Sequence, residues 1–214
     1  KISSKEIEIK DVRHIYGFTQ AQVEALYALA HHFGKDWLEG VKKSSIQELA
    51  MSLSSGGAFF ESTIGVIQRR AEQILRLPFV HGDPQVSITL NVINDLNLGK
   101  VVLIDTSNMS EQEELLISAV LARAVFSKNR EAYQDPAKFK KVLPTLIVME
   151  EAQRVLSQKG ESDINIFAQV SREGRKFKTG LCAITQQPKL IDEEILSQFN
   201  TLFILGLADE RDRN

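Results

Sequence analysis

Two adjacent carboxylates follow a strongly apolar segment in the second half of the chain. The octet Leu146–Gln153 reads LIVMEEAQ, so a buried strand would carry Glu150 and Glu151 at its carboxyl end. In nucleotide-hydrolysing motors this arrangement is the Walker B element, in which the first acid holds Mg²⁺ and the second orients and deprotonates the attacking water. The same acids would also suit a plain strand-to-helix junction, because carboxylates are favoured at a helix N-terminus. The octet alone leaves both interpretations open.

A basic segment follows about twenty residues later. Residues Ser171–Gly180 read SREGRKFKTG and carry Arg172, Arg175, Lys176 and Lys178 around the end of an expected helix. Arginine has planar, forked donors that suit a phosphate group, whereas lysine is a point charge. The segment therefore predicts a contact with the terminal phosphate of a nucleotide. The alternative is a solvated helix end, where cations are also favoured.

Amide side chains follow the next apolar run. The segment Ile184–Pro188 reads ITQQP and places Gln186 and Gln187 just after an expected strand. Polar amides at that position could sense a nucleotide phosphate or position a water molecule. Taken alone this signal is weak, because glutamine is common where loops begin.

The elements that would position these groups alternate in the second half of the chain. Residues 19–98 read as mostly helical, and from Lys100 onward short apolar runs alternate with helices, which is typical of a parallel sheet with helices on both faces. The expected strands are Val101–Asp105, Thr145–Met149, Gly180–Thr185 and Thr201–Leu207. The expected helices are Ser110–Arg130, a helix capped by Asp163 that reaches Arg172, and Ile191–Gln198. Functional groups of such sheets gather at the carboxyl ends of the strands, where the Asp105, Glu150 and Gln186 side chains would fall.

Composition narrows the class of protein. The chain has 214 residues, 43% of them hydrophobic and 25% charged, which is ordinary for a globular domain and excludes disorder of the whole chain. The formal net charge of −2 argues against a broadly basic protein that coats nucleic acid, although it allows a local basic strip. The single cysteine, Cys182, excludes an internal disulfide and fits a reducing compartment. No membrane span or signal peptide is predicted, so we expect a cytoplasmic protein.

Together the three motifs and the segment that follows them resemble one family. The order of EEAQ, REGRKF, TQQP and LSQFNTLFILGLADERDR resembles the HerA family of DNA-translocating ATPases, which are RecA-like motors related to FtsK, and most of all its archaeal members. The resemblance covers Lys100–Arg213, and residues 19–98 look like the helical insertion of that family. It implies an α/β fold with a RecA-like P-loop ATPase core at 100–214 and a mainly helical insertion region at 1–99.

The resemblance also implies roles for single residues. Glu150 would hold Mg²⁺ and Glu151 would be the catalytic base. Arg175 would be an arginine finger that reaches the ATP of a neighbouring subunit, with Arg172 as a weaker candidate. Gln186 would be the polar sensor. Asp105, at the end of a flanking strand, would lie near the nucleotide.

One motif of the family is missing from these residues. No GxxxxGK[ST] sequence occurs, and a phosphate cradle needs the backbone N–H groups and the lysine of that loop. We therefore expect the Walker A strand to precede Lys1, in a longer protein of which this chain is an inactive fragment. That protein would be a homo-hexamer that translocates double-stranded DNA and works with a NurA-type nuclease in end resection and recombinational repair. The alternatives are a conjugative or secretion-type motor ATPase and a non-catalytic interaction module derived from a P-loop protein.

Overall fold

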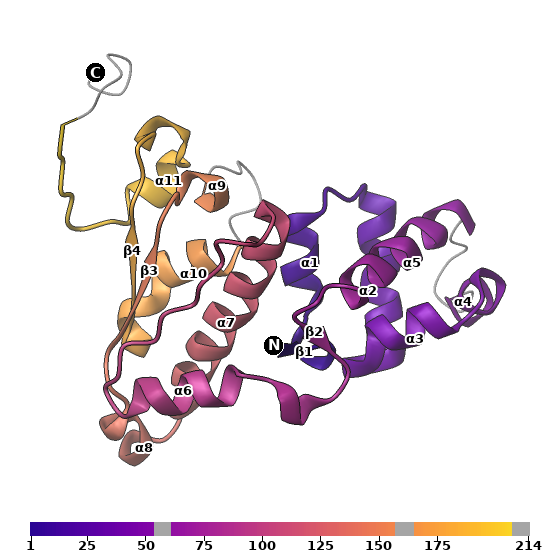
Figure 1. The fold of residues 1–214 in the computed structure, drawn as a ribbon, viewed down its shortest axis with the longest axis horizontal. Coiled ribbons are helices and arrows are strands. Elements are labelled where there is room, and N and C mark those ends of the chain that lie inside the picture. Colours follow the sequence, from indigo (N-terminus) through magenta and orange to yellow (C-terminus); the bar gives the residue numbers. More distant parts are fainter. Residues whose placement is uncertain (54–60, 157–164, 207–214) are drawn as a thin grey trace. The chain divides into compact units, whose positions relative to one another are not determined.

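A computed structural model of the chain describes residues 1–53, 61–156 and 165–206. These residues form helices and small parallel sheets, compatible with the predicted α/β class (Figure 1). They divide into two compact units, one from residues 1–91 and 106–120 and the other from residues 92–105 and 121–206. In the described residues no helix is long and apolar enough to cross a membrane. The predicted division at residue 99 into an insertion and an ATPase core stays a prediction.

The first unit is mainly helical, as its sequence predicts. Its helices are α1 (Ile9–Ile15), α2 (Gln20–Phe33), α3 (Trp37–Lys43), α4 (Ile46–Leu53) and α5 (Glu61–Leu75). Two short strands that the sequence did not predict, β1 (Ile2–Ser3) and β2 (Val80–His81), pair in parallel. Each has two residues, which is too short to leave a periodic pattern in the sequence.

Capping and burial explain these helices. The Thr19 hydroxyl accepts from the Gln22 N–H at the start of α2, and Ser45 and Glu48 make the same reciprocal pair before α4. In α5 the apolar residues that recur at helical spacing are buried, namely Ile64, Ile67, Ala71 and Ile74. The Trp37 ring is also buried, and its Nε1–H donates to the Ile7 carbonyl over 2.9 Å.

The second unit contains the motifs. Its elements are most of α6 (Thr89–Asn97), the second half of α7 (Glu111–Ala132), α8 (Pro136–Lys141), β3 (Thr145–Met149), α9 (Gln153–Leu156), α10 (Ile166–Glu173), the 3-10 turn η4 (Gly174–Phe177), β4 (Thr179–Ala183), η5 (Pro188–Leu190) and α11 (Glu193–Leu196). Gly99 lies two residues beyond the end of α6 and has a left-handed φ of 75°, which is common for the glycine that follows a helix. The core includes the rings of Phe126 and Phe177, which meet edge to face at 5.4 Å.

Strands β3 and β4 lie side by side and run in parallel (Figure 1). Their register pairs Thr145 with Thr179 and Met149 with Ala183, so both strands begin and end at the same level. Helix α10 packs against β4. A buried hydrogen bond of 3.0 Å from the Asn129 amide of α7 to the Thr179 hydroxyl ties α7 to the beginning of β4.

Two of the four predicted strands are wrong. Val101–Asp105 and the described part of Thr201–Leu207 have no regular secondary structure, and Val101, Leu103 and Phe203 are 97%, 89% and 91% exposed. An apolar, β-branched run fits a sheet, but it becomes a strand only when its backbone groups pair with a neighbour. Within the described residues these two runs have no such pairing.

Two further expectations need correction. The prediction that Asp163 caps α10 is wrong: that residue lies outside the described ranges, and the Asn165 side chain accepts from the Phe167 N–H instead. Asparagine and aspartate are about equally favourable at an N-cap. The sheet is also not covered on both faces by the described residues, because the Leu146 and Val148 side chains of β3 are 62% and 59% exposed.

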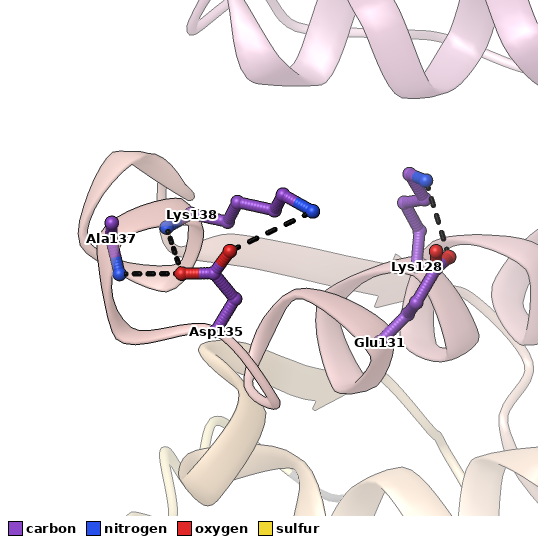
Figure 2. A network of polar contacts seen from close by, with 5 residues as sticks. All are labelled: Lys128, Glu131, Asp135, Ala137 and Lys138. Atoms are coloured by element: carbon purple, nitrogen blue, oxygen red, sulfur yellow. Dashed lines mark hydrogen bonds and ion pairs between the residues drawn. The ribbon is translucent and has the colours of Figure 1, made fainter.

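Helix α8 precedes β3 and begins at a polar network on the surface. Figure 2 shows the Asp135 carboxylate accepting from the Ala137 and Lys138 backbone N–H groups, at 2.9 and 3.3 Å. The Lys138 ammonium lies 3.6 Å from the same carboxylate, and Lys128 pairs with Glu131 on α7. These backbone hydrogen bonds hold the pKa of Asp135 below its ordinary value.

Candidate functional site

The two acids of the EEAQ motif lie at the carboxyl edge of the β3–β4 sheet. Backbone hydrogen bonds continue past the strands, from the Ile184 N–H to the Met149 carbonyl at 2.9 Å and from the Ala152 N–H to the Ile184 carbonyl at 3.0 Å. Glu150 and Glu151 therefore lie beside the segment that follows β4. The predicted meeting of these two motifs at one edge is confirmed.

Glu151 has an unusual backbone conformation. Its φ is 50°, in the left-handed region that residues other than glycine seldom occupy. Such a residue costs roughly 1–3 kcal/mol and is retained only where its surroundings determine it. Glu150 is exposed, whereas Glu151 is half-buried. The strand therefore ends in a sharp turn that separates the environments of the two carboxylates.

Two polar residues that sequence reasoning did not single out support Glu151. The Gln153 Nε2–H donates to the Glu151 Oε2 over 2.5 Å, and the Thr185 hydroxyl donates to the Gln153 Oε1 over 2.6 Å. Gln153 is buried, with 8% of its surface exposed. Both residues lay inside quoted motifs, EEAQ and ITQQP, but neither motif indicates that they face each other across two strands.

The remaining candidates at this edge are less enclosed. Gln186 is exposed and directly follows Thr185, the residue that holds Gln153 against Glu151. Asp105 is exposed in the extended segment before α7, which no ladder hydrogen bond ties to the β3–β4 sheet among the described residues. The placement of Asp105 at the end of a flanking strand is therefore wrong.

The two arginines lie at the other end of the sheet. Arg172 is in the last turn of α10 and Arg175 is in η4, which leads into the amino end of β4. Both are exposed, and among the described residues the Arg175 side chain has no hydrogen bond or ion pair. Because β3 and β4 are parallel, a strand length of about 16 Å separates η4 from the acids. Within a single copy of the chain, Arg175 and Glu151 therefore lie at opposite ends of the two strands.

Close packing fixes the turn that carries Arg175. A Cβ added to Gly174 would lie 2.1 Å from the Thr179 carbonyl oxygen, so only glycine fits where η4 crosses the start of β4. The turn ends at Lys178, whose φ of 54° is left-handed. The backbone around Arg175 is thus held on both sides.

The lysines of the same basic segment have structural contacts. The Lys178 ammonium donates to the Phe139 and Val142 carbonyls, at 2.9 Å each, and lies 4.7 Å from the Phe139 ring centre. The Lys176 ammonium lies 5.0 Å from the ring centre of Tyr133. These contacts separate the two lysines, which anchor the turn, from Arg175, whose side chain is exposed.

The acidic edge suits a metal ion that arrives with a nucleotide. In the described residues no group of three or more His, Cys, Asp or Glu side chains could enclose a metal ion. Mg²⁺ commonly binds through one or two carboxylates together with substrate phosphates and water, so the exposed Glu150 could supply one protein ligand. The residues present therefore fit Mg²⁺ bound with a phosphate ligand.

Comparisons with known proteins agree with the motifs. No protein-family model matches the chain. Proteins described as the DNA double-strand break repair helicase HerA are similar to it at 33% identity in Sulfolobus acidocaldarius, 30% in Pyrococcus furiosus and 31% in Saccharolobus solfataricus. Each similarity covers 58% of this chain and 25%, 27% and 25% of the respective relative.

The chain thus spans about a quarter of the length of the curated relatives it matches. The similarity extends over more than half of the chain and recurs in several HerA proteins. The resemblance predicted from the motifs is confirmed: over 58% of its length the chain is similar in sequence to proteins described as the DNA double-strand break repair helicase HerA.

Proposed function

We propose that this chain is part of an ATP-driven translocase of double-stranded DNA with a RecA-like core. The observation that carries the proposal is the pair Glu150 and Glu151 at the carboxyl edge of a parallel sheet, beside the segment that follows β4, in a relative of the HerA helicases. Phosphoryl transfer needs positioning and charge stabilisation more than covalent chemistry, and this edge offers both.

Each candidate residue takes one role in this proposal. Glu150 holds Mg²⁺, which neutralises charge on the phosphates when it is bound. Glu151 orients the attacking water and accepts its proton. Gln186 is a polar sensor of the nucleotide. Arg175 acts in trans on a neighbouring subunit, in keeping with its place at the opposite edge, and Arg172 is the second candidate for that role.

The whole protein is proposed to supply what these residues lack. A phosphate-binding loop would come from a segment outside this chain, and the working unit would be a hexamer. It would act with a NurA-type nuclease in end resection and recombinational repair in the cytoplasm. Asp105 would lie near the nucleotide in that assembly.

A second candidate is a non-catalytic interaction module derived from a P-loop protein. It is favoured by one observation, the absence of a GxxxxGK[ST] motif from the 214 residues. A conjugative or secretion-type motor shares the chemistry of the first proposal and differs in its substrate. Stimulation of ATP hydrolysis by double-stranded DNA distinguishes the translocase from both.

The test is the Glu151→Gln variant of the whole gene product that carries this segment. The amide keeps the shape of the side chain but cannot accept the proton, so we expect ATP binding to persist while turnover falls about 10²- to 10⁴-fold. Steady-state hydrolysis with and without double-stranded DNA, together with nucleotide binding by calorimetry, measures both effects. Loss of turnover in Glu150→Gln with near-parental turnover in Glu151→Gln would reverse the two roles.

A further inference from the structure

A chain of hydrogen bonds crosses the carboxyl edge from the end of β4 to Glu151. The Gln187 backbone N–H donates to the Thr185 Oγ1 over 3.0 Å, and the Thr185 hydroxyl donates to the Gln153 Oε1 over 2.6 Å. The Gln153 Nε2–H then donates to the Glu151 Oε2 over 2.5 Å. The chain joins residues 151 and 187, which lie far apart in sequence.

The Glu151 carboxylate sets the direction of every hydrogen bond in this series. An ionised carboxylate only accepts, so the amide nitrogen of Gln153 must face Glu151. The amide oxygen of Gln153 then faces Thr185, whose single hydroxyl proton must point toward it. The hydroxyl oxygen keeps its lone pairs for the Gln187 N–H. Each donor therefore has one acceptor, and reversing any member would leave two like groups facing each other.

This series of hydrogen bonds holds the Oε2 of Glu151 and leaves its Oε1 available to a further donor. Among the described residues, the Glu151 carboxylate accepts one hydrogen bond, from Gln153 through Oε2. Its Oε1 can therefore accept from a water molecule. Because Gln153 is buried and Glu151 has a left-handed backbone, rotation of the carboxylate would break a hydrogen bond in a place where water cannot easily replace it.

We propose that Gln153 and Thr185 are positioning residues that fix the Glu151 carboxylate and tie it to the segment after β4. The inference rests on the proposed function, because it gives Glu151 the role of base. A change of position in the Thr185–Gln187 segment is passed through the Gln153 amide to the carboxylate. The segment that carries the proposed sensor, Gln186, is thereby coupled to the base without touching it.

The experiment measures ATP hydrolysis by the whole gene product carrying Gln153→Met or Thr185→Val. Both substitutions keep the size of the side chain and remove the polar groups. We expect kcat to fall about 10- to 100-fold, as for small displacements of a catalytic group, with little change in the KM for ATP. Thr185→Ser keeps the hydroxyl and should restore turnover, and Gln198→Met is an exposed glutamine control that should behave like the parent.

The same substitutions in the Glu151→Gln variant separate an effect on the position of Glu151 from an effect on the stability of the protein. If Gln153 and Thr185 act through Glu151, adding either substitution to Glu151→Gln should lower the residual turnover no further. An equal loss in that background, or parental kcat in a folded Gln153→Met protein, would overturn the inference. If Gln153→Met fails to fold, the comparison of Thr185→Val with Thr185→Ser decides. Parental turnover in Glu151→Gln itself would instead refute the proposed function.

Discussion

Single residues in the basic segment differ in what they contact, and this decides which of them can reach a ligand. Lys178 and Lys176 contact carbonyl groups and aromatic rings of their own chain. Arg175 faces solvent from a turn that is held on both sides. Sequence reasoning recognised the cluster but could not separate its members, because the separating contacts are with Tyr133, Phe139 and Val142, roughly forty residues earlier in the chain.

We expect the loss of the Arg175 side chain to affect turnover far more than nucleotide binding. Arg175→Ala in the whole gene product should lower turnover roughly 10³- to 10⁵-fold while nucleotide affinity changes much less, because an arginine finger acts on the transition state. Lysine should not restore activity, since it lacks the planar fork. Mixing Arg175→Ala subunits with Glu151→Gln subunits should regain activity at interfaces that pair an intact finger with an intact base. Near-parental hydrolysis by Arg175→Ala would move the role to Arg172.

At the scale of helices and strands, local sequence patterns predict some features and miss others. The runs Val101–Asp105 and Thr145–Met149 look equally strand-like, yet only the second is a strand, because β4 lies beside it. Helix starts were easier to predict, since the pairs Thr19 with Gln22 and Ser110 with Glu113 are local in sequence. Pairing between strands is not local, so the carboxyl edge could be predicted and the hydrogen bonds across it could not.

The crossing of η4 over β4 makes a prediction about stability. Gly174→Ala would bring a methyl group against the Thr179 carbonyl oxygen, so we expect a loss of about 1–3 kcal/mol in the free energy of unfolding, typical of overpacking. Gly206→Ala is the matched control, because a Cβ there meets nothing within 4 Å. Thermal and denaturant unfolding of the two variants measures the difference. Equal stability of both would mean that η4 can shift at no cost.

Helix α8 should respond to acid through its cap. The folded pKa of Asp135 is lowered, so the cap contributes stability above the ordinary pKa of the residue and loses it as pH falls through the lowered value. A carboxyl ¹³C titration should show the lowered pKa, and amide exchange in α8 should quicken at the same pH. Asp135→Asn, which caps without titrating, should abolish the pH dependence of that exchange.

At the scale of the whole molecule, the proposed function gives this chain one part of a nucleotide site. Because it lacks the GxxxxGK[ST] loop, we expect the 214-residue chain by itself to show no measurable binding of Mg-ATP by calorimetry and no hydrolysis. Exposed apolar side chains on β3 and in residues 202–205 should instead favour non-native association. Micromolar binding of one ATP per chain would refute the interpretation as a fragment.

The parallel register of β3 and β4 also determines how the rate should scale with the amount of protein. If the acids at one end of the sheet work with an arginine from the other end of a second copy, each working site is assembled from two molecules. Hydrolysis per molecule of the whole gene product should then fall on dilution once copies begin to separate, following the mass-action law that governs any dissociating complex. A site completed within one copy would give the same specific activity at every concentration.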